Sequence, residues 1–482
     1  MPRTAGNRAR GDRFRRWLSA TCGDSSAGVA CRASHHWLRA CCFAALSCTC
    51  PGWAPAVAGE YDLGAGFLLA HDSNITRTAD PRADWTETWF AGVGYAERTT
   101  DLTARLLAQV ERRDFIRNTY QNDTAYFLNG AAVWTIAPQQ LSWTVEDLAG
   151  ESILNLTAPD TPANRTRTNS LSTGPEFTFR VDPTNTPVIG ARYGRYDIRG
   201  PGTDNQRYTG YVRWLHQLSE PEKLSLNYEA MRVNFSSPAL YPNFLQHDQF
   251  LRYERLSRPN SLLVEGGTTR VQRYGGEETH GRLARVAALH ALTSESAVRL
   301  LLADQISDSA TDSIRGVTSV TSPTTIATPT ETAASAPITG SNVTTGDVYR
   351  SQRGEVTYIT QSGRTGYTLQ GYVRRVDYAT LDQDYREAGG NLTLNSIQTE
   401  AVRIYASAEY MKRTFSSLGE RDTYRTGILG TTFRLTRSLG ASVEFRLMER
   451  ESNVPLESFL DRRVMLLLGY STGPQYSAGS RR

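Results

Sequence analysis

Three residue types of a hydrolase triad stand side by side in His71-Asp72-Ser73. Consecutive residues of a β-strand point to opposite faces, so these three cannot form one hydrogen-bonded catalytic chain. The sequence also contains no Gly-x-Ser-x-Gly nucleophile elbow. A hydrolase would need a serine and a histidine brought together from distant segments. We therefore do not expect an enzyme.

Metal-ligating residues are equally dispersed. All six cysteines precede residue 51, and the histidines beyond that point are scattered without metal-ligand spacing. The acidic stretches Asp377–Asp384 and Asp304–Asp312 could bind calcium, but ordinary solvated loops explain them better. We expect no metal and no cofactor.

Charged residues that alternate with apolar ones carry a clearer signal. A strand with this alternation has one apolar face and one charged face. Mixed arginine and glutamate on the inner wall of a pore would brace that wall or guide a solute, and the sequence favours neither role over the other. The residues that we predict to line such a lumen are Arg105, Glu111, Arg299, Arg353, Glu355, Arg374, Arg403, Glu409, Glu444 and Arg446.

The same alternation continues along almost the whole chain from Tyr61 onward. We count twenty segments of about ten residues, the length with which a tilted strand crosses a bilayer. The mean hydropathy of −0.44 does not argue against a membrane protein, because transmembrane strands expose one face to lipid and the other to the lumen.

The links between these segments alternate in length. Ser219-Glu220-Pro221 and Thr436-Arg437-Ser438 are short, whereas Asp72–Asp84, Asp147–Arg167 and Asp308–Gly346 are long. Outer-membrane barrels pair short periplasmic turns with long extracellular loops, and closure removes strand edges that lipid cannot satisfy. The sequence therefore predicts an all-β fold: a transmembrane antiparallel up-and-down β-barrel of about 18–20 strands in the cell outer membrane of a Gram-negative bacterium.

The first 58 residues differ from the rest. A basic flank precedes the apolar run Ala40–Leu46, and Ala56-Val57-Ala58 has the small-x-small pattern of a signal-peptidase site. We predict a signal peptide over 1–58 (possible misassigned start near Val29), cleaved after Ala58, and a barrel over 59–471. Within the barrel, residues 307–346 form a long Ser/Thr-rich loop. Residues 472–482 follow the barrel as a tail.

The charge of the chain is divided unevenly. Residues 1–58 carry a net charge of +6 against +4 for the whole chain, so the mature protein is slightly acidic and is not expected to bind nucleic acid.

Three segments resemble the β-barrel porin 2 family: Gly64–Arg77 resembles its opening strand and turn, Asn205–Trp214 a mid-barrel strand, and Arg463–Tyr470 the last strand. The resemblance would cover residues 60–471. It implies an outer-membrane barrel associated with exopolysaccharide or exosortase systems. The chain departs from the usual barrel ending, because residues 471–482 continue past the aromatic Tyr470.

These observations favour a channel or conduit for exopolysaccharide export or secretion. A general diffusion porin is the first alternative, and a surface adhesin, receptor or barrel-embedded enzyme is the second. The expected partners are outer-membrane lipid and lipopolysaccharide, the barrel-assembly machinery and polysaccharide export components.

Overall fold

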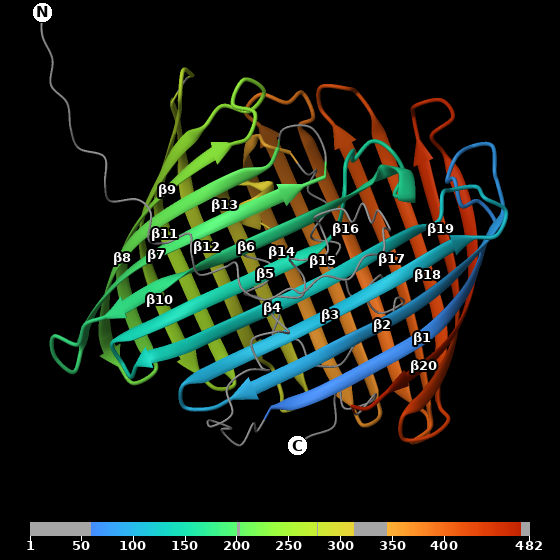
Figure 1. Cartoon of the computed structure of the whole chain (residues 1–482), viewed down its shortest axis with the longest axis horizontal. Coiled ribbons are helices and arrows are strands. Elements are labelled where there is room, and N and C mark those ends of the chain that lie inside the picture. Colours follow the sequence, from blue (N-terminus) through green and yellow to red (C-terminus); the bar gives the residue numbers. More distant parts are fainter. Residues whose placement is uncertain (1–58, 200–202, 277, 313–344, 474–482) are drawn as a thin grey trace, which may run out of the picture. The chain divides into compact units, whose positions relative to one another are not determined.

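The computed structural model describes residues 59–199, 203–276, 278–312 and 345–473. These residues form one sheet of twenty strands, which is coloured from blue to red along the chain in Figure 1. The predicted signal peptide with Ala56 and Ala58, most of the 307–346 loop and the tail beyond Gly473 lie outside the described residues.

Each strand is 13–15 residues long. In chain order the strands are β1 (Glu60–Asp72), β2 (Asp84–Arg98), β3 (Leu102–Phe115), β4 (Asp123–Ala137), β5 (Leu141–Ile153), β6 (Arg165–Thr178), β7 (Asn185–Ile198), β8 (Asn205–Ser219), β9 (Glu222–Phe235), β10 (Phe244–Ser257), β11 (Asn260–Arg273), β12 (Glu278–Ala291), β13 (Ser296–Asp308), β14 (Val348–Ser362), β15 (Thr365–Tyr378), β16 (Tyr385–Ile397), β17 (Val402–Phe415), β18 (Arg421–Arg434), β19 (Leu439–Ser452) and β20 (Phe459–Ser471).

The sheet closes on itself. Every strand pairs antiparallel with its neighbours in sequence, and β1 also pairs with β20 from Gly64↔Ser471 to Asp72↔Arg463. Closure satisfies the backbone hydrogen bonds that lipid could not. The predicted fold class is confirmed, and the described residues contain twenty strands.

Antiparallel partners point to the same side of a sheet, so the register fixes the face of each residue. Leu63 is 54 % exposed on one face, and its ladder continues through Val93 and Ala108. Exposed apolar residues such as Val373 and Leu429 occupy this outward face all around the barrel. The outward face is therefore the lipid-facing one, as expected for an outer-membrane barrel.

A charge on this face should destabilise the barrel. Leu106 is on the outward face of β3 and its neighbour Leu107 is on the inward face. We expect Leu106→Arg to lower the free energy of unfolding by about 2–4 kcal/mol if the site lies near the bilayer midplane. Leu107→Arg is the matched control and should cost clearly less. Urea unfolding in lipid vesicles measures both, and equal costs would contradict the assignment of faces.

The links follow the predicted alternation, but several strands run further than expected. The loop expected over Asp147–Arg167 is confined to 154–164, because β5 extends to Ile153 and β6 begins at Arg165. The sequence does not reveal this extension, because the residues at the strand ends are polar. The alternation of apolar residues stops at the lipid boundary, while the backbone pairing continues beyond it. No helix in the described part of the chain is long and apolar enough to cross a membrane.

Candidate channel and its two inward hairpins

The ten residues that we predicted to line the lumen have their side chains on the inward face by register. Arg105 and Glu111 share the inward face of β3, and the other eight have inward positions on β13, β14, β15, β17 and β19. Their role in guiding a solute stays a prediction.

Several inner-wall arginines are paired with nearby carboxylates. Arg446 Nη2 is 2.8 Å from Glu444 Oε1, and Arg353 forms an ion pair with Glu355. Both are i, i+2 pairs on one face of one strand. Arg252 Nε similarly donates a 2.6 Å hydrogen bond to Glu265 Oε1. This geometry supports bracing of the wall at these positions, because each guanidinium is compensated by an adjacent carboxylate.

The hairpin of β5 and β6 leaves the wall at its outer end. The described β4–β5 register stops at Leu128↔Ala149, although β4 begins at Asp123 and β5 continues to Ile153. The β5–β6 register, in contrast, continues to Ile153↔Arg165. The tip of this hairpin is therefore held by its own pairing and separated from β4. As a result, Arg113 on the inward face of β3 can reach Glu151, with Arg113 Nη2 2.7 Å from Glu151 Oε1.

The loop at this tip, residues 154–164, has its own internal structure. It ends in the 3₁₀ turn η2 (Pro162–Asn164). Asn164 Nδ2 donates to the carbonyl oxygens of Asn155, Ala158 and Pro159 at 2.7, 3.1 and 3.1 Å, and Asn164 Oδ1 accepts from the Asn155 backbone N–H at 3.0 Å. One buried asparagine side chain thus satisfies polar backbone groups that the loop would otherwise leave unpaired inside the barrel.

This loop reaches the opposite wall. Leu156 is 3 % exposed and belongs to an apolar cluster with residues of β14, β15, β16 and β17, namely Tyr349, Val376, Tyr378, Tyr385 and Phe415. Arg413 Nη1 donates to the Leu156 carbonyl oxygen at 3.5 Å. Because β5–β6 and β15–β16 are ten strands apart in a ring of twenty, the loop crosses the lumen.

Charged residues hold the same loop against a third part of the wall. Arg165 Nε is 2.7 Å from Asp160 Oδ1, and Arg77 in the β1–β2 loop donates to the Asp160 carbonyl oxygen. Burial raises the pKa of the Asp160 carboxyl, but the attraction of Arg165 outweighs it and the pKa lies below its ordinary value. Burial lowers the pKa of Arg77, against the opposing effect of Asp160 and Asp461. These charges help to fix the loop across the lumen.

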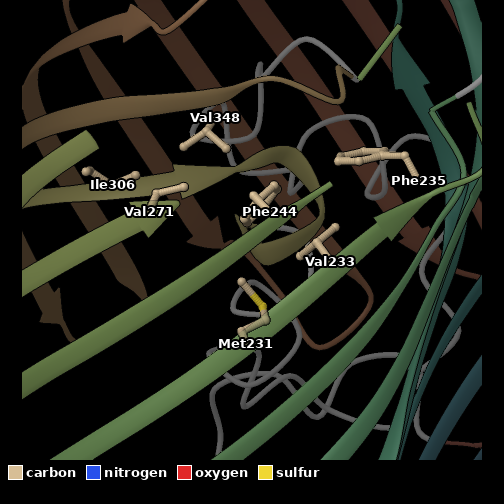
Figure 2. Close-up of a cluster of buried hydrophobic side chains, with 7 residues drawn as sticks. All are labelled: Met231, Val233, Phe235, Phe244, Val271, Ile306 and Val348. Carbon is tan, nitrogen blue, oxygen red and sulfur yellow. The ribbon is translucent and has the colours of Figure 1, made fainter. Parts of the chain in front are cut away.

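In the hairpin of β13 and β14, the outer end of β13 separates from β12 and leans inward, while β14 stays paired with β15 as far as Tyr349↔Tyr378. The described β12–β13 register stops at Ala284↔Asp304, whereas β13 stays paired with β14 as far as Asp308↔Val348. In Figure 2, Ile306 and Val348 of this hairpin lie over the inner side of β9, β10 and β11. They form a buried apolar cluster with Met231, Val233, Phe235, Phe244 and Val271.

A buried ion pair completes this second contact. Arg207 of β8 and Asp308 at the end of β13 both have side chains that are 4 % exposed, and Arg207 Nη1 donates to Asp308 Oδ2 at 3.0 Å. Asp308 Oδ1 also accepts from the backbone N–H groups of Ala310 and Thr311. Ala310 packs with Tyr196 and Ile198 of β7. The described start of the 307–346 loop is therefore directed into the barrel.

The sequence did not predict that these two hairpins extend into the lumen, and one predicted lumen residue has a different environment as a consequence. We expected Arg374 to face open water, but it is only 8 % exposed, beside Tyr385 of the cluster that receives Leu156. The apolar residues Ile153, Leu154 and Leu156 at the start of a loop that is otherwise mostly polar were the available signal for an inward loop.

The His71-Asp72-Ser73 triplet does not form a catalytic triad in the structure. The side chains of His71 and Asp72 lie on opposite faces of β1. The Ser73 hydroxyl donates instead to Asp461, with Oγ 3.3 Å from Asp461 Oδ1. No group of three or more His, Cys, Asp or Glu in residues 59–199, 203–276, 278–312 and 345–473 could hold a metal ion.

No family model and no curated protein matches this chain. Among solved structures it is similar to the FrpB iron transporter from Neisseria meningitidis, with 8 % identity, 85 % of this chain and 81 % of that chain covered, and a TM-score of 0.42. It is also similar to OccK2 from Pseudomonas aeruginosa, with 9 % identity, 86 % and 98 % covered, and a TM-score of 0.36. The closed barrel and its lipid-facing belt place the protein in the outer membrane.

Proposed function

We propose that this protein is an outer-membrane conduit for a polysaccharide chain, and that the β5–β6 loop closes this conduit in the conformation seen in the structure. An interior of twenty strands is too wide for wall side chains to fill. The lumen must then hold water or folded-in chain, and the loop at 154–164 is such a segment. A route for an extended polymer exists once this loop moves.

The observation that carries the proposal is a hydrogen-bonding surface of amide and hydroxyl side chains on the inner wall, bordered by Glu355 and Glu409. Cross-strand neighbours on β14, β15 and β16 are Thr357, Gln370 and Asn391, and the next row contains Thr393 and Ser407. Asn391 Nδ2 donates to Ser407 Oγ at 3.1 Å, and Thr393 Oγ1 donates to Asn391 Oδ1 at 2.9 Å. Amide and hydroxyl groups both donate and accept, which suits a polyhydroxylated solute.

The pairing of wall charges supports the same cargo. Arg446 is paired with Glu444, and Arg353 with Glu355, so a small ion finds little net charge at these positions of the wall. A channel for small anions would need unpaired guanidinium groups along its path. The resemblance to the β-barrel porin 2 family agrees with a polysaccharide cargo. A general diffusion porin is the second candidate, favoured by the exposed inward-facing Arg299.

Cells lacking the protein should test this proposal. We expect them to lose surface polysaccharide and to retain polymer in the periplasm, while uptake of small solutes is unchanged. Restoring the wild-type chain should restore export. Asn391→Leu should restore it poorly, because the change removes two hydrogen-bonding groups from the inner wall. Leu392→Ala, one position away on the lipid-facing side, is the matched control and should export normally. Normal surface polysaccharide together with slowed small-solute uptake would favour the porin instead.

A further inference from the structure

The outward face of β15–β18 carries an unusual concentration of positive charge near its outer end. Arg375 of β15 and Arg386 of β16 are direct cross-strand partners. The same ladder row continues through Thr414 of β17 to Arg421 of β18. Lys412, one of only two lysines in the chain, occupies the row below. All four cationic residues are exposed. We call Arg375, Arg386, Arg421 and Lys412 the cationic patch.

Little negative charge balances this patch. Arg375 Nε is 2.8 Å from Asp377 Oδ1. Among the described residues, this is the only ion pair that a residue of the cationic patch forms. Some arginines elsewhere on the outward face do have acidic partners: Arg112 is 2.9 Å from Asp114 and Arg195 is 2.8 Å from Asp197. Like charges directly opposite one another in a sheet destabilise it. The Arg375–Arg386 pair therefore favours an anion from outside the chain.

The height of the patch identifies the kind of anion. Val373 is 59 % exposed in the same row as Lys412, and Tyr410 is 50 % exposed one row further toward the lipid. The apolar belt continues below them through Leu392 and Leu429. The patch thus begins where the belt ends, at the end of the barrel opposite the start of β1 and the end of β20. In an outer-membrane barrel this is the level of the outer-leaflet headgroups.

We propose that the cationic patch binds the phosphate groups of a phosphorylated glycolipid of the outer leaflet. Arginine matches phosphate with its planar fork of donors, and lysine adds a point charge. Clusters of basic residues beside an apolar membrane segment are the usual recognition device for anionic headgroups. The acyl chains of the same lipid then lie along the belt formed by Val373, Leu392 and Tyr410. This inference does not depend on the cargo of the lumen.

Native mass spectrometry of the purified protein in detergent tests the site. The probes are bis-phosphorylated lipid A, the same lipid without its phosphates, and inorganic phosphate. We expect the wild type to retain bis-phosphorylated lipid A, and R386Q/K412Q to bind it at least about tenfold more weakly. The control R112Q/R195Q removes two outward arginines from other strands and should bind as the wild type does. A heat-modifiable shift in electrophoretic mobility confirms that each variant is folded.

Three results would overturn the proposal. Equal retention of the phosphorylated and dephosphorylated lipids would show that the patch does not recognise phosphate. Equal losses in R386Q/K412Q and R112Q/R195Q would show that the effect is general to outward charge. Release of the lipid by inorganic phosphate at a comparable concentration would show a site for free phosphate rather than for a lipid.

Discussion

Deleting residues 155–163 and joining the hairpin with two glycines should raise the ion conductance of the barrel about tenfold or more, because this loop crosses the lumen. Leu156 holds the loop in the apolar cluster of the facing wall, and Asp160 holds it to Arg77 and Arg165. Deletion removes all these contacts while leaving every strand intact. Conductance of single channels in planar bilayers measures the effect.

Two further variants separate a plug from a general effect of shortening a loop. Leu156→Arg places another cation in the buried cluster beside the Arg413 guanidinium and should also raise conductance, since buried like charges repel each other and the loop is expelled. Replacing the exposed Ser417–Gly419 of the β17–β18 loop by two glycines should change nothing. Unchanged conductance in both the 155–163 deletion and Leu156→Arg would mean that the lumen is closed elsewhere or that the loop is already displaced in the membrane.

The alternation of polar and apolar residues was enough to predict the barrel, because each strand of a closed sheet must show one face to lipid. Leu106 and Leu107 illustrate both the strength and the limit of this signal: both are apolar, yet the flanking alternation assigns them to opposite faces, and the register agrees. The inward side of the ten predicted residues also follows from parity alone.

The inward lean of two hairpins could not be predicted in this way. Leaning moves a strand end into the lumen without changing its alternation, so Ile153 and Asp308 look like ordinary strand residues. The contact of Arg207 with Asp308 joins residues 101 positions apart, and no local pattern encodes it. By contrast, the wall pair Arg446–Glu444 has i, i+2 spacing on one face, and the sequence already contained that signal.

The buried Arg207–Asp308 pair gives the second large effect that we expect. Arg207→Ala leaves the Asp308 carboxylate buried without its cation, and a buried pair broken on one side typically costs about 3–5 kcal/mol. The loss should appear as undocking of the outer end of β13, since β13 is paired with β12 only up to Asp304. Hydrogen exchange of the Gln305–Asp308 amides measures it, and these amides should exchange much faster than those of β19.

The companion variants decide whether charge causes the effect. Asp308→Asn keeps the acceptor oxygen that caps Ala310 and Thr311 but removes the negative charge, leaving the Arg207 guanidinium unpaired. Combining Asp308→Asn with Arg207→Leu should therefore cost less than the two single changes together, because neither buried charge remains. Arg195→Ala breaks an exposed pair with Asp197 and should cost no more than about 1 kcal/mol. Strictly additive losses in the double variant would mean that Arg207 acts through its packing on Met231 and not through Asp308, and the apolar cluster alone would then hold the hairpin inward.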